Sequence, residues 1–259
     1  MPNKSLGQHW LFDSKSLGDI CDAAELSRDD TVLEIGPGLG PLTTELVTRA
    51  KKVIAVELDK ELATYLPIRV GAKNLEVEQG SILHFDLSKL PKKYKVVANV
   101  PYYLTSKIVR LLLESPTPPS MAVLLVQLEV AQRLAARPGD MSILAVSAQF
   151  YADVRLGSIV TSDKFDPPPK VDSQVVIFEH RHKPLFDDVD VKTYFRVVKA
   201  GFGEKRKTLR NSLSGGLHLT KDAAEALLHK AGVSPGARAE ELSLQDWHKL
   251  VLGYSKKST

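Results

Sequence analysis

The sequence has little cysteine and no long apolar run. Cys21 is the only cysteine, so the chain has no intrachain disulfide and no zinc site built from several cysteines. The seven histidines show no HxxxH or HExxH spacing, and we predict no metal site. No apolar stretch approaches the roughly 18 residues of a membrane-spanning helix. Residues 1–13 lack the apolar segment of a signal peptide and the Arg-rich pattern of a transit peptide. We therefore expect a cytoplasmic protein that does not enter a membrane.

The composition is that of a soluble globular protein, with 43% hydrophobic and 25% charged residues. The net charge of +4 is unevenly placed, because residues 185–259 hold 13 basic and 9 acidic residues and so carry the whole excess. Within 196–211 there are six basic residues and one acid, Glu204. A cluster of this kind is typical of a polyanion-binding surface, although a solvated helix face would have the same composition.

A glycine-rich loop follows the first β-branched segment. Thr31 to Ile35 predicts a strand, Gly36-Pro37-Gly38-Leu39-Gly40 a loop, and Pro41 to Ala50 a helix. This order is the doubly wound nucleotide-binding arrangement, although the spacing is GxGxG and not GxGxxG. The next strand, Lys52 to Leu58, contains Glu57 near its end, where a carboxylate can accept hydrogen bonds from ribose hydroxyls. An ordinary tight turn is the alternative explanation for the glycines alone.

Further strands and helices alternate up to about residue 128. We expect strands over 75–79, 94–98 and 121–128, and helices over 59–70, 105–114 and 129–137. Residues 142–150 form another apolar segment, and late strands over 154–160 and 175–179 would be adjacent if they form a hairpin. Ligands in such sheets bind beyond the carboxyl ends of the strands, where the glycine loop, Glu57, Ser81 and Asn99 would converge.

The stretch Asn99-Val100-Pro101-Tyr102 follows an apolar strand and has the residue types of a site for amine chemistry. An exocyclic purine amine is a poor nucleophile, because its lone pair is delocalised into the ring. An Asn oxygen and a backbone carbonyl can accept both of its N–H bonds, and an aromatic ring can stack on the base. Pro101 restricts Val100 and so directs its carbonyl. A β-turn after the strand is the alternative for these four residues.

A proline-rich segment, residues 165–173, cannot be a helix interior or a central strand. It is either a spacer between strands or a stiff loop that presents Phe165 as a platform for a base. From residue 184 onward, amphipathic helical patterns replace the strands, over 191–203, 206–213, 221–231 and 243–252. We therefore expect two domains, residues 1–183 and a small all-helical domain of residues 184–259.

Taken together, these motifs resemble the small-subunit ribosomal RNA adenine dimethyltransferases, the KsgA family, over almost the whole chain. The resemblance rests on six segments: Lys4-Ser5-Leu6-Gly7-Gln8-His9, residues 32–40, Asn99-Val100-Pro101-Tyr102-Tyr103, Phe165-x-Pro167-x-Pro169-x-Val171-x-Ser173, residues 205–211 and Arg238-Ala239-Glu240. The glycine and Asn-x-Pro-Tyr motifs occur in many methyltransferases. The proline loop, the basic run and Arg-Ala-Glu are more specific.

The resemblance implies an α/β fold, a Rossmann-like seven-stranded class I methyltransferase domain with a C-terminal helical domain. It implies transfer of four methyl groups from S-adenosyl-L-methionine to N6 of two adjacent adenosines near the 3′ end of small-subunit RNA. The implied partner is this RNA or an immature small ribosomal subunit, and we expect a monomer. Large-subunit rRNA adenine dimethylases that confer macrolide resistance, and a non-catalytic RNA-binding assembly factor, are the alternatives.

The resemblance also implies roles for individual residues. In the family, the positions of Asn99 and Val100 accept from the target amine, Tyr102 stacks on the adenine, and Phe165 is a second aromatic wall. We expect Pro101 to belong to the same catalytic group. The expected cofactor contacts are Gln8, His9, Leu11, Gly36, Gly38, Gly40, Glu57, Leu58, Ser81, Ile82 and Asn99. The expected RNA contacts are Lys205, Arg206, Lys207 and Arg210. Ser81 departs from the usual Asp that accepts from the cofactor's adenine amine, and Trp10 replaces the usual Phe, a difference that we interpret as packing.

Overall fold

The computed structural model describes residues 9–204 and 206–255. The chain divides into two compact units, one formed by the chain up to Gln132 with Tyr151–Arg181, the other by Arg133–Phe150 with the chain from His182 onward. A single cut between residues 183 and 184 therefore does not separate these units. Residues 133–150, which we expected in the first domain, group with the C-terminal residues.

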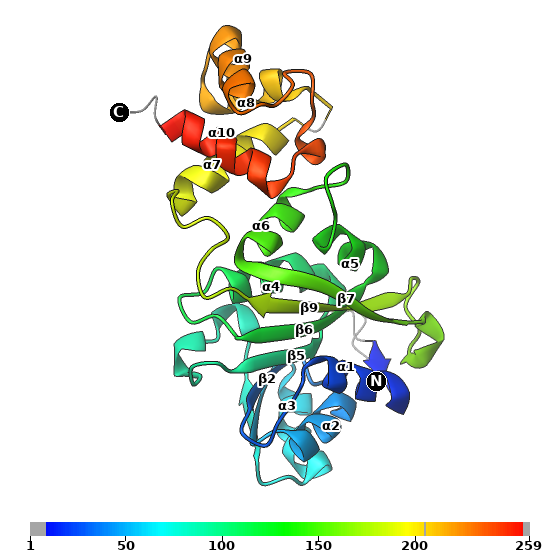
Figure 1. The fold of residues 1–259 in the computed structure, drawn as a ribbon. Coiled ribbons are helices and arrows are strands. Elements are labelled where there is room, and N and C mark those ends of the chain that lie inside the picture. The colour runs from blue at the N-terminus through cyan, green and yellow to red at the C-terminus, as the bar shows by residue number, and fades with distance from the viewer. Residues whose placement is uncertain (1–8, 205, 256–259) are drawn as a thin grey trace. The chain divides into compact units, whose positions relative to one another are not determined.

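The first unit is built on a seven-stranded sheet with the order β4-β3-β2-β5-β6-β9-β7. Figure 1 shows β2, β5, β6, β9 and β7 side by side in this order. The strands are β2 (Thr31–Ile35), β3 (Lys52–Glu57), β4 (Leu75–Gln79), β5 (Lys95–Asn99), β6 (Met121–Gln127), β7 (Ala152–Val160) and β9 (Ser173–His180). The first five pair in parallel, whereas β9 pairs antiparallel with both β6 and β7. The expected Rossmann-like class and the pairing of the two late strands are confirmed.

Helices precede or follow the parallel strands of this unit. They are α1 (Ser14–Ala23), α2 (Pro41–Arg49), α3 (Lys60–Val70), α4 (Thr105–Leu113) and α5 (Leu128–Leu134), with short 3₁₀ turns η2 (Ile82–His84), η3 (Leu87–Lys89), η4 (Tyr102–Leu104) and η5 (Ser162–Lys164). Local chemistry sets their starts: Pro41 is the first residue of α2, and the Asp59 carboxylate accepts from two backbone N–H groups of α3. The carboxyl ends of β2, β3, β4 and β5 therefore lie at one edge of the sheet.

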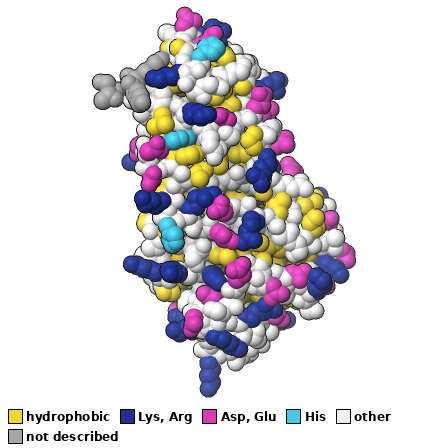
Figure 2. Space-filling model, in the orientation of Figure 1, with side chains coloured by type: hydrophobic (Ala, Val, Ile, Leu, Met, Phe, Trp, Pro, Cys, Tyr) yellow, Lys and Arg dark blue, Asp and Glu magenta, His cyan; other side chains and the backbone are white. Residues whose placement is uncertain are grey.

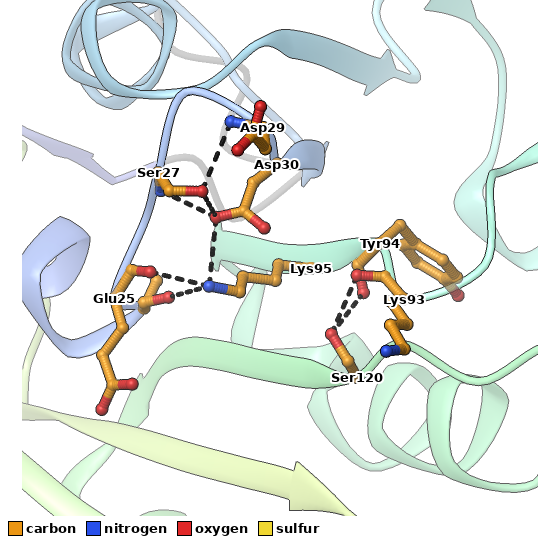
Figure 3. Close-up of polar contacts among 9 residues, drawn as sticks. Glu25, Ser27, Asp29, Asp30, Lys93, Tyr94, Lys95 and Ser120 are labelled. Atoms are coloured by element: carbon orange, nitrogen blue, oxygen red, sulfur yellow. Dashed lines mark hydrogen bonds and ion pairs between the residues drawn. The ribbon is translucent and has the colours of Figure 1, made fainter.

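The opposite, amino edge of the sheet is held by Lys95, the first residue of β5. Its ammonium donates to the carbonyls of Ala24 and Glu25 after α1 and to the Asp30 carboxylate before β2, at 3.1, 2.7 and 3.2 Å (Figure 3). The Ser27 hydroxyl and backbone N–H also donate to Asp30. Burial alone would raise the pKa of Asp30, but these donors hold it below the usual value. One cation therefore joins α1, β2 and β5.

A hydrophobic cluster packs the helical side of the sheet. It joins Leu17 and Ile20 of α1 and Leu46 of α2 to the strands. The cluster also contains Leu11 and Phe165, which face each other across a two-stranded pair of β1 (Trp10–Leu11) and β8 (Phe165–Asp166). The sequence pattern did not predict this pair, because two residues are too few to show a strand periodicity. It anchors both the N-terminal segment and the proline-rich loop.

The second unit is helical, with α6 (Ile143–Tyr151), α7 (Val191–Phe202), α8 (Leu209–Leu217), η6 (Ala239–Glu241), α9 (Lys221–Lys230) and α10 (Leu244–Ser255). The apolar segment at 142–150 is thus a helix. The expected helix over 206–213 is misplaced: α8 begins at Leu209, so Arg206 and Lys207 precede it. The two arginines at 206 and 210 therefore do not share a helix face.

The surface gives no single charged field on the side seen in Figure 2, where Lys and Arg side chains are interspersed with Asp and Glu. Within residues 9–204 and 206–255, no helix is long and apolar enough to cross a membrane. The same residues contain no group of three or more His, Cys, Asp or Glu side chains placed to hold a metal ion.

Candidate active site

A cleft opens at the carboxyl edge of the sheet, with a free volume of about 1070 Å³ that includes the part open to solvent. Its walls come from the glycine loop, the end of β3, the loop before η2, the end of β5 and the N-terminal segment. The expected residues that line it are His9, Leu11, Gly36, Gly38, Glu57, Leu58, Ser81, Ile82, Asn99, Val100, Pro101 and Tyr102. The structure therefore brings together residues that lie up to 93 positions apart in the sequence.

The glycine loop is held to β3 by Glu57. Its carboxylate accepts from the backbone N–H of Gly38 at 3.0 Å and from that of Asp59 at 2.9 Å. Gly36 and Gly38 have φ angles of +65° and +58°, which L side chains rarely adopt. A Cβ on Gly38 would lie 2.7 Å from Nε1 of Trp10. This loop needs glycine both for its backbone and for the indole that covers it.

A second carboxyl group, Glu34, also lines the cleft. It lies within the apolar strand β2 and is 1% exposed, and its Oε2 atom has no hydrogen-bond partner among the described residues. Burial, reinforced by the nearby Glu57 charge, raises the pKa of Glu34 to about 8. Burial also raises the pKa of Glu57, although three backbone N–H groups oppose the shift. Both carboxyls would be stabilised in the charged state by a cation in the cleft.

His9 connects three segments that are distant in sequence. Its Nδ1 lies 2.7 Å from the Pro167 carbonyl, and because a carbonyl only accepts, Nδ1 carries the proton. Its own carbonyl accepts from Nδ2 of Asn99 at 3.1 Å. The amide nitrogen of Asn99 is thus occupied by the protein, which leaves Oδ1 as the acceptor that Asn99 can offer to a ligand.

Tyr102, the first residue of η4, is fixed at both its hydroxyl and its ring. The hydroxyl lies 2.8 Å from Oγ of the fully buried Ser173 on β9. The ring stacks on His9, with centroids 5.8 Å apart and planes 21° apart. Burial raises the pKa of the phenol, so it stays neutral at ordinary pH. The side chain is held rigidly at the rim of the cleft.

Some expected site residues lie elsewhere. Gly40 does not line the cleft; a Cβ there would lie 2.5 Å from Leu66 of α3, so this glycine permits close helix packing. Phe165 is 4% exposed and belongs to the hydrophobic cluster, so the structure does not place it as a wall of the cleft. Gln8 lies outside the described residues.

Ser81 lines the cleft, as expected, and its side chain also makes a hydrogen bond within the protein. Its Oγ accepts from the Leu83 backbone N–H at 3.3 Å, so it caps the start of η2. The hydroxyl retains one lone pair and its own proton, which makes it a neutral polar partner for a ligand.

Among the cleft-lining residues that sequence reasoning missed, three have aromatic or acidic side chains. Trp10, which we had interpreted as a packing difference, covers Gly38 and lines the cleft. Glu34 was overlooked, although an acid inside the apolar run of β2 is an unusual signal. Tyr103, beside Tyr102, lines the cleft and is 58% exposed. An exposed aromatic ring at a rim is available to a ligand from solvent.

The basic run is largely paired within the protein. Arg210 is 2.8 Å from Glu225 of α9 and 3.9 Å from Asp222, and Lys207 pairs with Glu204 at 2.5 Å. Arg206 is exposed and has no ion pair with a described carboxylate. Lys205 lies outside the described residues. Of this set, Arg206 is thus the described side chain whose charge is left for a partner.

A model of the ribosomal RNA adenine dimethylase family matches residues 2–256. The chain is 42% identical, over 98% of its length and 88% of the relative's, to the ribosomal RNA small subunit methyltransferase A of Dehalococcoides mccartyi strain 195. It is 40% identical to the protein of the same name from Nostoc sp., over 96% of this chain and 97% of that one.

Two solved structures have the same fold over nearly the whole chain. A dimethyladenosine transferase from Plasmodium falciparum superposes with a TM-score of 0.83 at 27% identity, covering 96% of this chain and 98% of that one. The 23S rRNA methyltransferase ErmE superposes with a TM-score of 0.77 at 32% identity, covering 95% and 99%.

Proposed function

The chain belongs to the ribosomal RNA adenine dimethylase family, and from this premise we propose that it transfers methyl groups from S-adenosyl-L-methionine to N6 of adenosines in small-subunit rRNA. The observation that carries the proposal is that Asn99 lines the same cleft as Gly38 and Glu57, with its amide nitrogen bound to His9. A cofactor site and an amine acceptor are thus joined in one cleft.

The residues of the cleft fit this cofactor. S-adenosyl-L-methionine carries a sulfonium and an ammonium, and Glu34 is a buried carboxyl with an unpartnered oxygen atom. Glu57 accepts from backbone N–H groups at both carboxylate oxygens, and its remaining lone pairs can accept from ribose hydroxyls. The apolar side chains of Leu58 and Ile82 would cover the adenine ring, with Ser81 as the neutral polar partner.

When bound, the cofactor supplies an electrophilic methyl group on sulfur. The chain's own residues align the amine with it: Asn99 Oδ1 and the Val100 carbonyl accept the two N–H bonds, and the Tyr102 ring stacks on the base. Fixing these groups beforehand removes most of the orientational cost of the reaction. No buried base is required, because the methylated amine is acidic enough to lose its proton to solvent.

Tyr103 extends the same rim outward. We place it against the nucleotide next to the target, because it follows Tyr102 directly and its ring is exposed. Stacking of successive bases on neighbouring aromatic side chains is the usual means of holding a single strand. The substrate adenosines must leave their own stack to reach the cleft.

The small-subunit assignment is supported by the relatives at about 40% identity over nearly the full chain, which carry that name. ErmE, at 32%, acts on 23S rRNA, so the large-subunit alternative shares the catalytic fold. We assign methyl transfer to the first compact unit and RNA docking to the second, with the protein acting as a monomer on RNA or on an immature small subunit.

The test uses purified small and large ribosomal subunits from cells that lack this protein. The full chain is incubated with each subunit and methyl-labelled S-adenosyl-L-methionine, and the RNA is digested and analysed by mass spectrometry. We expect N6,N6-dimethyladenosine in small-subunit RNA only. Product in large-subunit RNA would support the alternative dimethylase, and RNA binding without product in either would support an assembly factor.

A further inference from the structure

The basic charge of the second unit is distributed over paired and unpaired side chains. Arg210, Lys207, Arg238 and Lys249 each have a carboxylate within 4.0 Å. Such a pair must be broken, or shared, before the cation can contact a phosphate. Residues without such a partner are therefore the better candidates for a polyanion contact.

Helix α7 carries three unpaired cations on one face. Lys192, Arg196 and Lys199 are all exposed, and none has an ion pair with any carboxylate that the structure describes. Their spacing of four and three residues places them one above another on the helix, over about 10 Å of its axis. The nearest acid in sequence, Asp190, caps the helix by accepting from the backbone and hydroxyl of Thr193.

The other face of α7 is fully used by the fold. Tyr194, Val197, Val198 and Gly201 are buried, and the helix packs on α8 and α10. The basic face is thus presented by a rigid element. Arg196 also lies 5.8 Å from the centre of the Tyr254 ring of α10, which adds an aromatic surface beside the charges.

We infer that the face of α7 formed by Lys192, Arg196 and Lys199 is the main phosphate-binding surface of the second unit and docks on the sugar–phosphate backbone of the RNA substrate. The inference rests on the proposed function for the identity of the polyanion. It replaces most of the basic run at 205–210 as the expected docking site, because Lys207 and Arg210 are neutralised by carboxylates of the protein. Phosphate contacts of this kind position an RNA without reading its sequence.

The experiment compares two double variants of the full chain that remove equal charge. K192Q/K199Q changes the α7 face, whereas K221Q/K230Q removes two exposed and unpaired lysines from the ends of α9. A triple variant adds R196Q. Thermal unfolding confirms that each variant is folded, and calorimetry measures its affinity for S-adenosyl-L-methionine. Binding to small-subunit RNA transcribed in vitro is then measured between 50 and 300 mM salt.

We expect the triple variant to bind RNA about tenfold or more weakly and to lose about two units from the slope of log affinity against log salt. K192Q/K199Q should lose about 1.4 units, and K221Q/K230Q should match the wild type, with cofactor affinity unchanged throughout. Equal affinity and slope for the α7 and α9 variants would overturn the inference.

The experiments distinguish a failure of the proposed function from a failure of the α7 surface assignment. If the wild type binds RNA through α7 with the expected slopes but methylates neither ribosomal RNA, the proposed function is wrong and the surface assignment stands. If the wild type methylates small-subunit RNA and the α7 variants keep the wild-type slope, the surface assignment is wrong and the function stands.

Discussion

The two edges of the sheet differ in whether their polar groups have partners within the protein. At the amino edge, Lys95 satisfies two carbonyls and the Asp30 carboxylate, so the charges there are paired. At the carboxyl edge, Glu34 is buried with an oxygen atom that has no described partner, and the glycine loop has positive φ angles. The polar groups at the amino edge are satisfied within the protein, whereas the carboxyl edge keeps a buried carboxyl oxygen without a described partner.

The pKa values of two carboxyls show this difference directly. Donors hold the pKa of Asp30 below its usual value, whereas burial raises that of Glu34 to about 8. Asp30 therefore stabilises the fold above the pKa of the unfolded chain and loses this contribution in acid. Glu34 behaves in the opposite way and weakens the fold as the pH rises.

The largest expected effect on activity is at the carboxyl edge. Asn99→Ala removes the acceptor for the target amine and should lower the methyl-transfer rate at saturating substrate by at least about 100-fold, because positioned acceptors act mainly in the transition state. Single-turnover assays with small subunits measure this rate. A rate within threefold of the wild type would contradict the assignment.

The matching change at the amino edge should affect stability and not activity. Lys95→Met keeps the aliphatic stem but leaves two carbonyls without this donor and Asp30 with its Ser27 donors alone, so we expect a loss of about 2 kcal/mol in the free energy of unfolding. Lys52→Met is the control, since Lys52 begins β3 but its pair with Glu76 is exposed, and it should cost less than about 1 kcal/mol. Urea denaturation measures both. Equal losses in the free energy of unfolding would show that Lys95 stabilises the amino edge no more than the exposed Lys52 does.

A smaller effect, on the pH dependence of the free energy of unfolding, is expected from Glu34. The folded protein holds a proton on this carboxyl that the unfolded chain releases above the ordinary Glu pKa of 4.5, so the stabilising contribution is lost as the pH rises toward the raised pKa of about 8. Glu34→Gln stays neutral throughout. The free energy of unfolding of the wild type relative to this variant should fall by at least about 1 kcal/mol between pH 5 and pH 8. A constant difference over this range would mean that Glu34 titrates normally.

The smallest effect is expected at the rim. Tyr103→Ala should raise the KM for RNA about tenfold without changing cofactor affinity, because it removes one stacking surface. Tyr103→Phe retains the ring and should stay within about twofold of the wild type. If both variants raise KM alike, the hydroxyl and not the ring makes the contact.

Much of the fold could be predicted, because β2, β3, β5 and β6 are apolar, and β2 and β3 are followed by clear helix starts at Pro41 and Asp59. The two-residue pair of Trp10–Leu11 with Phe165–Asp166 could not be predicted, since it depends on tertiary contacts across the whole first unit. The start of α8 was also misjudged. Arg206 and Lys207 have good helix propensity, but they lie in a turn before α8.

The site could be predicted where it follows strand ends, as for Glu57 and Asn99. Side-chain direction was not predictable, so Phe165 was expected at the cleft although it is buried in the hydrophobic cluster. Ion pairs between helices could not be predicted from the sequence either. The pairing of Arg210 with Glu225 changes which basic side chains remain available to RNA. The roles of the residues at the cleft remain predictions until the variants are measured.

The position of the two indoles gives the protein its own optical probes. Trp10 lies against Gly38 in the cleft of one compact unit, and Trp247 is fully buried in the other. These are the only tryptophans of the chain. Emission from Trp10 should respond when the cleft is filled, whereas a red shift of Trp247 should follow unfolding of the helical unit. A Trp10→Phe variant separates the two signals, so ligand entry and domain melting can be followed without an added dye.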